Sequence, residues 1–187
     1  MYERKSFSMT LKEKYELMIA RGRNAIIYFD MDGVLAKWKF APLDETAEPG
    51  FFYNLDLEPS VRDAVLLLNE AGFAVSILSA VYMNGIAEVD KSRWLDKFDM
   101  PHIDRTFVPY GQKKTDYINK EHDTFILLDD YNLNLVEWDK HKEQNYVAVK
   151  FLNGVNGGSG TWTGRTLHYH SDGATIANAL ADIAALA

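Results

Sequence analysis

The fold of this chain is decided by residues 25–35, Ala25-Ile26-Ile27-Tyr28-Phe29-Asp30-Met31-Asp32-Gly33-Val34-Leu35. The first five residues are apolar or aromatic without polar alternation, which predicts a strand buried on both faces. The strand ends on Asp30 and Asp32, whose side chains would share one face of a regular strand. Because unpaired buried carboxylates are costly, we expect a cation beside them, and hard oxygen ligands suit Mg²⁺. Gly33 then lets the chain turn sharply. Taken alone, the pattern also fits a strand-end turn with two solvated aspartates.

The composition predicts one globular domain over residues 1–187. The chain is 47% hydrophobic and 25% charged, and it is long enough to bury a proper core. It contains no cysteine, which excludes a disulfide framework, a thiolate metal site and a cysteine nucleophile, and which fits a cytoplasmic location. The net charge of −7 disfavours nucleic acid as a partner, and no apolar run reaches the length of a membrane span. Nothing in the sequence indicates an oligomeric state.

The rest of the chain alternates between helical and strand-like segments. After the first strand we expect helices at 59–70, 86–98 and 133–141, a helix start at 112–120, and strands at 73–79, 105–110, 123–128 and 146–152. A helix capped by Thr10 precedes them, and an Ala-rich helix, Ala174–Ala187, closes the chain. Strands without polar alternation that alternate with helices indicate an α/β fold with a parallel sheet covered on both faces.

The segment between the first strand and the next helix, residues 36–60, is expected to be a small cap or lid. It combines Pro and Gly punctuation with several aromatic residues, among them Phe40, Phe51 and Phe52. Two interpretations stay open for these rings. In the first, the rings pack against the core and hold an ordered loop in place. In the second, they stack on a planar ligand that binds at the end of the first strand.

The segment 153–172 carries two weaker patterns. Residues 153–160 are rich in glycine but do not match G-x-G-x-x-G, and a strand-like stretch follows, so we expect a hairpin loop and not a nucleotide-binding turn. His168, His170 and Asp172 alternate along the chain. A solvated strand face explains this alternation better than a metal site does.

Polar residues follow the strands at several points of the chain. They are Asp30 and Asp32 after the first strand, Ser79 after the second, a lysine after the third, and Asp129 and Asp130 after the fourth. In an open parallel sheet these carboxyl ends form the ligand-binding edge. The set suits phosphoryl transfer, in which Asp30 attacks phosphorus, Asp32 serves as general acid and base, and Asp30, Asp32 and Asp129 hold Mg²⁺. Ser79 and the lysine would bind the phosphate oxygens.

The motifs around these residues resemble those of the haloacid dehalogenase (HAD) superfamily of phosphatases. Phe29–Leu35 is similar to its first motif, Ile77–Ser79 to its second, Lys114 to its third, and Leu127–Asp130 to its fourth. The resemblance implies a Rossmann-like fold, a Mg²⁺ cofactor bound partly by the backbone carbonyl of Asp32, and an aspartyl-phosphate intermediate. It favours Lys114 over its neighbour Lys113, because Lys-Thr precedes an apolar stretch in the family. Asp130 would support the metal without binding it.

Within that superfamily the chain resembles the 5′(3′)-deoxyribonucleotidases. The closer match rests on Asp32–Ala36, on Phe51–Leu55 with Glu58-Pro59, and on Lys91-x-x-Trp94-Leu95-x-Lys97-Phe98. It implies a nucleoside monophosphate as substrate. Because the lid rings lie close in sequence to the nucleophile, we expect at least one of Phe40, Phe51 and Phe52 to touch the base. The family carries a longer helical cap than residues 36–60, so the phosphate chemistry transfers more firmly than the nucleotide preference. A phosphatase for another small metabolite, or a silent binding protein of the same fold, remain alternatives.

Overall fold

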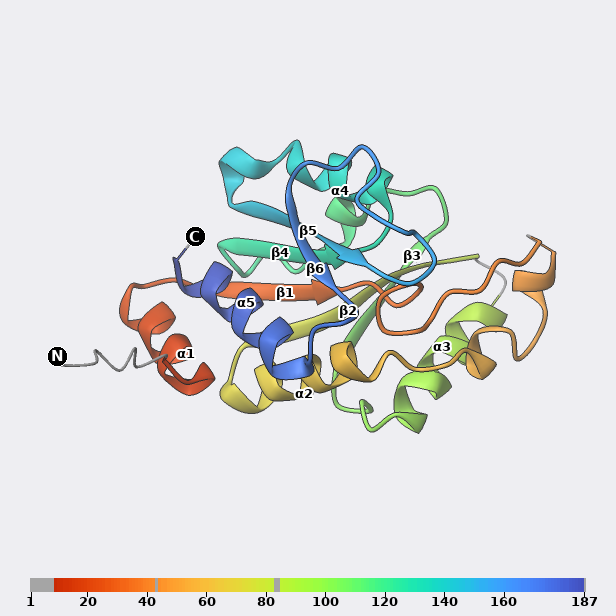
Figure 1. Cartoon of the computed structure of the whole chain (residues 1–187), viewed down its shortest axis with the longest axis horizontal. Coiled ribbons are helices and arrows are strands. Elements are labelled where there is room, and N and C mark those ends of the chain that lie inside the picture. The colour runs from red at the N-terminus through yellow and green to blue at the C-terminus, as the bar shows by residue number, and fades with distance from the viewer. Residues whose placement is uncertain (1–8, 43, 83–84, 187) are drawn as a thin grey trace, which may run out of the picture.

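The computed structural model describes residues 9–42, 44–82 and 85–186, and its centre is a six-stranded parallel sheet (Figure 1). The spatial order of the strands is β3-β2-β1-β4-β5-β6, and every neighbouring pair is parallel. The strands are β1 (Ala25–Phe29), β2 (Ala74–Val81), β3 (Asp104–Pro109), β4 (Thr124–Asp129), β5 (Tyr146–Leu152) and β6 (Arg165–His168). The predicted α/β architecture is therefore confirmed.

The central strands are buried on both faces. In β1, Ile27 and Phe29 belong to one hydrophobic cluster, and Ile26 and Tyr28 belong to a second cluster on the opposite face. A strand that faces two apolar layers favours apolar residues at every position between its ends, which explains the unbroken apolar run in its sequence. β4 is buried at every position in the same way.

Helices cover both faces of this sheet (Figure 1). They are α1 (Leu11–Ala20), α2 (Pro59–Ala71), α3 (Ile86–Lys97), α4 (Asn132–Asp139) and α5 (Gly173–Leu186). The first three and α5 contribute to the cluster around Ile27, whereas α4 packs on the other face through Leu135 and Trp138. Thr10 caps α1 in a capping box with Glu13, as its sequence indicates. The predicted closing helix matches α5 except for Ala187, which lies outside the described residues. Across the described ranges, every helix falls short of what a membrane crossing demands in length and apolar character.

Three local predictions are wrong. β2 does not end at Ser79 but continues to Val81, because it pairs with β3 as far as Pro109. The helix expected to start near Gln112 is only a 3₁₀ helix, η3 (Lys114–Tyr117), which lacks a side-chain cap and gives way to extended backbone at Ile118. Another short 3₁₀ helix, η4 (Lys142–Gln144), precedes β5.

The expected hairpin at 153–160 is the third error. β6 pairs with β5 in the parallel direction, so residues 153–164 form a crossover and not a hairpin. Trp162 on this crossover is buried in the same apolar cluster as Trp138, and Asn132 donates hydrogen bonds to Ser159 and Thr161. Through these contacts the segment packs over the face of the sheet that α4 covers, and it then returns to form β6 at the edge beside β5.

Residues 36–60, which we call the lid after the role expected of them, lie beside α3 at the end of the molecule opposite α1 (Figure 1). The lid is irregular as far as Glu58 apart from the 3₁₀ helices η1 (Glu45–Ala47) and η2 (Phe52–Asn54), and its last two residues already belong to α2. Leu43 lies outside the described residues. Two side chains of α3 bind its backbone: Asp90 accepts a hydrogen bond from Gly50 N (2.6 Å), and Trp94 donates one to Leu55 O (2.8 Å). These contacts hold the lid near the carboxyl edge of the sheet.

Candidate active site

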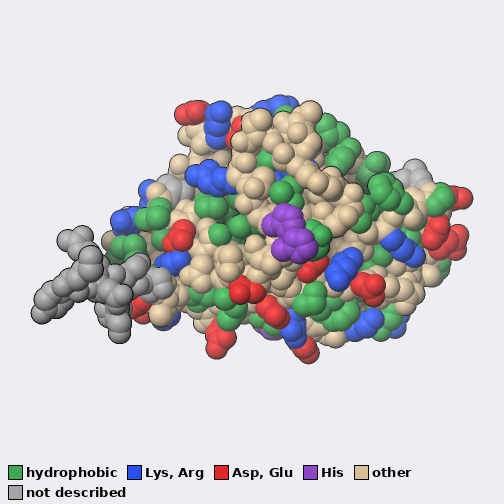
Figure 2. Space-filling view, in the orientation of Figure 1, with side chains coloured by type: hydrophobic (Ala, Val, Ile, Leu, Met, Phe, Trp, Pro, Cys, Tyr) green, Lys and Arg blue, Asp and Glu red, His purple; other side chains and the backbone are tan. Residues whose placement is uncertain are grey.

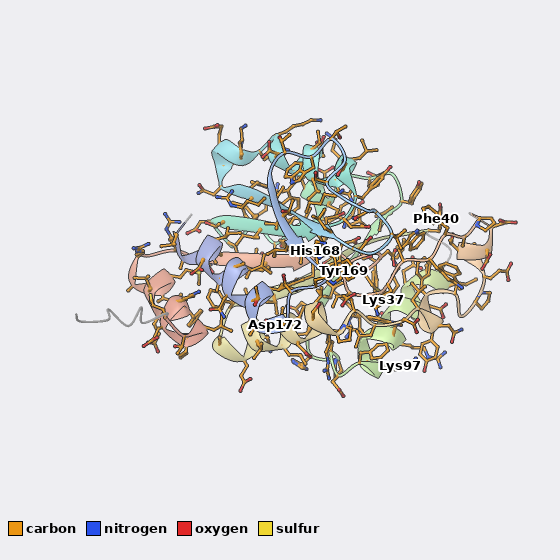
Figure 3. The ribbon with its side chains drawn as sticks, viewed as in Figure 1. Lys37, Phe40, Lys97, His168, Tyr169 and Asp172 are labelled. Carbon is orange, nitrogen blue, oxygen red and sulfur yellow. The ribbon has the colours of Figure 1, made fainter. Side chains whose placement is uncertain are left out.

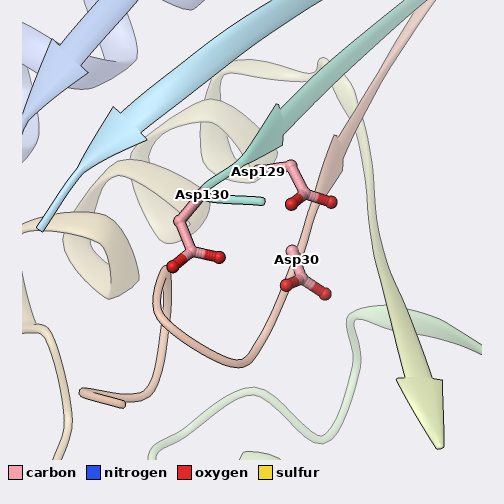
Figure 4. A group of neighbouring side chains, drawn as sticks. All are labelled: Asp30, Asp129 and Asp130. Atoms are coloured by element: carbon pink, nitrogen blue, oxygen red, sulfur yellow. The ribbon is translucent and has the colours of Figure 1, made fainter. Parts of the chain in front are cut away.

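The carboxylates of Asp30, Asp129 and Asp130 converge at the carboxyl edge of β1 and β4 (Figure 4). Asp30 is the first residue after β1, Asp129 is the last residue of β4, and the two strands are neighbours in the sheet. One carboxylate oxygen from each of the three residues lies within 4.8 Å of the other two. Adjacent parallel strands end at the same edge, so two separate acidic motifs of the sequence become one cluster.

Lys114 joins this cluster from η3. Its Nζ donates hydrogen bonds to Asp30 Oδ1 (2.8 Å) and Asp129 Oδ2 (2.7 Å), and all three side chains are buried. Burial alone would lower the pKa of Lys114, but Asp129 and Asp30 outweigh it and raise the pKa, so the ammonium stays charged. Lys113 instead lies at the surface, where it pairs with Glu137. Of the two adjacent lysines, the site therefore includes the one that the sequence favours.

The hydrogen-bond partners of the three carboxylates indicate whether a divalent cation would fit among them. Only one ammonium group among the described residues, that of Lys114, contacts the cluster. Asp129 accepts hydrogen bonds from Tyr131 N (2.8 Å) and Asn134 Nδ2 (2.9 Å) in addition to Lys114. Asp130 has only Asn153 Nδ2 as a side-chain donor (2.9 Å) among the described residues, and burial, with Asp129 and Asp30 nearby, raises its pKa to about 8. Burial and the neighbouring carboxylates favour the protonated form of Asp130, and a nearby cation would favour the charged form instead. Three carboxylate oxygens this close together therefore fit a hard cation such as Mg²⁺.

Asp32 takes a different environment from the other acids. The expectation that the first strand ends on Asp30 and Asp32 is wrong. β1 stops at Phe29, and both aspartates lie on the loop after it, where Met31 O accepts hydrogen bonds from Val34 N and Ala36 N and turns the chain. The Asp32 carboxylate does not belong to the three-carboxylate cluster. Its Oδ2 accepts a hydrogen bond from Lys91 (2.6 Å), and its Oδ1 is buried without a hydrogen-bond partner among the described residues. Burial raises the pKa of Asp32, with Lys91 opposing and Asp30 reinforcing the effect.

Lys91 is a site residue whose role sequence reasoning missed. It is fully buried on α3, and its Nζ donates to Ser79 Oγ (2.9 Å) and Ala80 O (2.8 Å) as well as to Asp32. The sequence did contain a signal. Lys91 shares a helical face with the buried residues Ala87 and Trp94, and a lysine on a buried face requires charged or polar partners.

Gly33 is the residue that lets the loop pass Asp130. Its φ is +79°, and a Cβ at this position would lie 2.2 Å from Asp130 Oδ2. Asn153 Nδ2 bridges the two residues by donating to Gly33 O (2.7 Å) and to Asp130. Any larger residue at 33 would therefore displace a carboxylate of the cluster as well as strain the backbone.

Gly33→Ala should lower both the melting temperature and the stabilisation that Mg²⁺ provides. The left-handed backbone alone costs roughly 1–2 kcal/mol. Gly22→Ala is the matched control, because Gly22 has φ +71° and a Cβ added there would meet no described atom within 4 Å. Thermal melts of both variants, with and without Mg²⁺, separate the backbone strain from the displacement of Asp130. Equal Mg²⁺ stabilisation in the two variants would contradict this account.

The three lid phenylalanines lie in different surroundings. Phe40 is 87% exposed, and Figure 3 shows it on the outer part of the lid. Phe51 is buried, and its ring packs edge-on against Trp38 and Phe52. Phe52 lines a hollow of about 210 Å³, which we call the aromatic hollow and which Asp32, Trp38, Ala80, Tyr82 and Tyr110 also line. Among the three, only Phe52 lines the hollow beside Asp32.

The alternating residues near β6 do not form a metal-binding group in the part of the chain that the structure describes. The rings of His168 and His170 stack with their centroids 4.6 Å apart, and His170 N donates to His168 Nδ1. Figure 2 shows histidine side chains gathered in the middle of one face, and Figure 3 labels His168 there. Asp172 caps α5 by accepting a hydrogen bond from Thr175 N. The expected strand face is wrong, because β6 ends at His168 and Asp172 caps a helix, but His170 and Asp172 are exposed as the expectation of a solvated surface requires.

Comparison with known proteins supports the fold. No family model and no curated protein sequence matches the chain. Among solved structures, the D,D-heptose 1,7-bisphosphate phosphatase from Burkholderia thailandensis matches with a TM-score of 0.56 and 15% sequence identity. The match covers 84% of this chain and 98% of that phosphatase. At this identity the likeness shows a shared fold alone, an α/β fold of the Rossmann-like kind.

Proposed function

We propose that this protein is a HAD-type phosphomonoester hydrolase that depends on Mg²⁺ and works through an aspartyl-phosphate on Asp30. The observation that carries the proposal is the contact of Lys114 with both Asp30 and Asp129, at the sheet edge where Asp130 also lies. A purely structural salt bridge is complete with one carboxylate for each ammonium group. Here Lys114 contacts two carboxylates, and Asp130 adds a third carboxylate beside them, which favours a site for a cation and a phosphate.

The residues divide the chemistry between two steps. Asp30 attacks phosphorus through a carboxylate oxygen while the bond to the leaving oxygen breaks, and Asp32 gives that oxygen a proton. In the second step Asp32 takes a proton from water, the water oxygen attacks phosphorus, and the bond to Asp30 breaks to release phosphate. Lys114 holds Asp30 Oδ1, which leaves Oδ2 of the same carboxylate for the attack. Ser79 retains its hydroxyl proton to donate to a phosphate oxygen, because its Oγ accepts from Lys91.

Asp30, Asp129 and Asp130 are the residues that would hold Mg²⁺, together with the backbone carbonyl of Asp32. When bound, the cation offsets the repulsion between the carboxylates and an incoming phosphate and stabilises negative charge on the transferring group. Asp130 departs from its expected supporting role, because its carboxylate reaches the cluster directly. Its raised pKa without a cation is a further reason to assign it as a ligand.

We further propose that the substrate is a nucleoside monophosphate, with its base in the aromatic hollow. This hollow lies beside Asp32, and its rings Trp38, Phe52, Tyr82 and Tyr110 suit a planar group. A sugar phosphate or another small metabolite is the second candidate, and the matched solved structure is named as a phosphatase of a heptose bisphosphate. A silent binding protein is disfavoured because Asp30, Asp32, Lys114 and Asp129 are all present.

The deciding experiment is a screen of phosphorylated metabolites that reads released phosphate with Mg²⁺ and with EDTA. Release from nucleoside monophosphates, and not from sugar phosphates, would support the nucleotidase proposal. Release from sugar phosphates alone would retain the phosphatase and reject the nucleotide. An absence of release from every ester would reject the enzyme altogether.

Phe52→Leu should raise KM for nucleoside monophosphates about ten- to a hundredfold, because stacking on one ring contributes roughly 1–3 kcal/mol to binding. It should leave KM for glycerol phosphate nearly unchanged, since that ester has no base. Phe40→Ala is the control, because Phe40 is exposed and does not line the hollow. Melting temperatures of both variants separate lost packing from lost stacking. Equal losses of Phe52→Leu on both substrates, tracking a lower melting temperature, would contradict the stacking role.

A further inference from the structure

Lys91 uses all of its hydrogen-bonding capacity inside the protein. Its side chain is fully buried, and its ammonium has three N–H donors. Three acceptors lie within hydrogen-bonding distance: Asp32 Oδ2 (2.6 Å), Ala80 O (2.8 Å) and Ser79 Oγ (2.9 Å). The ammonium also lies 4.4 Å from the centroid of the Phe52 ring. No donor remains for a phosphate oxygen, so Lys91 differs in kind from a lysine that binds substrate.

The contact with Lys91 makes the two oxygens of Asp32 unequal. Lys91 fixes Oδ2, whereas Oδ1 is buried and has no hydrogen-bond partner among the described residues. Asp32 also lines the aromatic hollow. Because buried polar atoms in proteins are almost always hydrogen-bonded, a buried carboxylate oxygen beside a hollow is well placed to bind a group that enters the hollow. As a carboxylate oxygen it suits the O–H group of a water, and when protonated it can donate to an ester oxygen of a substrate.

We propose that Lys91 is a positioning residue that orients Asp32, so that Oδ1 faces the leaving oxygen in the first step and the attacking water in the second. The inference rests on the proposed phosphatase function and deepens it. Lys91 does not touch the reacting atoms and acts through Asp32. The hydrogen bonds of Lys91 to Ser79 and Ala80 fix its ammonium, and with it the Asp32 carboxylate, relative to β2. Lys91 also belongs to α3, the helix whose side chains bind the lid backbone.

The test uses Lys91→Met, which keeps an unbranched apolar stem and removes the ammonium. Its matched control is Lys14→Met, because Lys14 is another buried lysine, but it binds Asn178 and Asp182 on α5 away from the site. Two esters are compared in single-turnover measurements. p-Nitrophenyl phosphate has a leaving group that departs without a proton, and phenyl phosphate has one that needs an acid.

The expected result is asymmetric between the two esters. Lys91→Met should slow phosphoryl transfer from phenyl phosphate on the order of 10²-fold and transfer from p-nitrophenyl phosphate far less, because general acid catalysis is typically of that size. Hydrolysis of the phosphoenzyme also needs Asp32, so p-nitrophenyl phosphate should give a burst of nitrophenolate followed by a slow steady rate. KM should change by the same factor for the two esters, because any effect that passes through Ser79 acts on the phosphate group that both esters share. Lys14→Met should keep the wild-type ratio of the two transfer rates. In an Asp32→Asn background, Lys91→Met should cause no further loss.

Equal slowing of transfer for both esters, or a further loss in the Asp32→Asn background, would overturn the positioning role. If Lys91→Met does not fold, Lys91→Gln keeps a polar donor at the position and is read by the same two rates. Different measurements test the positioning role of Lys91 and the proposed phosphatase function. A wild type that releases no phosphate overturns both, whereas an active wild type with equal variant losses overturns the role of Lys91 alone.

Discussion

Asp30→Asn should reduce phosphate release by a factor on the order of 10⁴ or more, as removal of a nucleophile does in other covalent enzymes. The amide has the shape of the carboxylate, and its oxygen can still accept the hydrogen bond that Lys114 donates to Asp30 Oδ1. The fold should therefore persist, with a melting temperature without Mg²⁺ that equals or exceeds that of the wild type. Removing one of three crowded carboxylates relieves repulsion within the cluster.

Asp123→Asn is the matched control for this experiment. Asp123 immediately precedes β4, at the opposite edge of the sheet, where its carboxylate accepts a hydrogen bond from Asn24 N. It should keep full activity. Wild-type enzyme quenched during turnover should carry phosphate on the peptide that contains Asp30, and the Asp30→Asn variant should carry none. Near-wild-type release from Asp30→Asn would exclude the covalent mechanism.

The sequence was most informative where burial leaves few choices. Unbroken apolar runs located the start of β1, and both ends of β4 to within a residue, because strands that face two apolar layers carry few polar residues between their ends. The first strand, however, ends earlier than expected, at Phe29. The parallel arrangement then brought Asp30 and Asp129 to one edge, since neighbouring parallel strands end together. Those two inferences needed only local patterns and a rule of topology.

The sequence was less informative where a contact depends on long-range geometry. The interaction of Lys91 with Asp32 joins residues 59 positions apart and depends on how α3 crosses the sheet edge. The glycine-rich run at 153–160 indicated a reversal of the chain, but local composition does not fix the direction of the next strand. The burial of Trp162 on one face of the sheet carries the segment across, and β6 pairs in the parallel direction.

The lid shows a third kind of limit. Its aromatic composition indicated order, and the buried rings of Phe51 and Phe52 agree with that. Composition alone did not separate rings that fill the core from rings that line a hollow. Phe51 packs between Trp38 and Phe52, whereas Phe52 also faces the hollow beside Asp32. Neighbouring residues in a 3₁₀ turn point in different directions, so adjacent phenylalanines need not share a role.

Asp129→Asn should raise the Mg²⁺ concentration for half-maximal activity by roughly ten- to a hundredfold, because it replaces a charged hard ligand by a neutral one. Asp129 also accepts hydrogen bonds from Lys114, Asn134 and Tyr131 N. An amide can satisfy the donors on one side only, so its NH₂ group meets another donor. The melting temperature should fall, since an unsatisfied buried group costs about 1–3 kcal/mol.

Asp130→Asn separates the loss of a metal ligand from this loss of structure. Asp130 accepts a side-chain hydrogen bond from Asn153, and its raised pKa of about 8 marks it as a destabilising charge when no cation is bound. The Asp130→Asn variant should therefore weaken Mg²⁺ binding while raising the metal-free melting temperature at pH 8. Mg²⁺ titrations of phosphate release and of the melting temperature measure both effects in each variant. An unchanged Mg²⁺ requirement in Asp129→Asn, with the requirement raised in Asp130→Asn, would assign the metal to Asp130 and leave Asp129 as the anchor of Lys114.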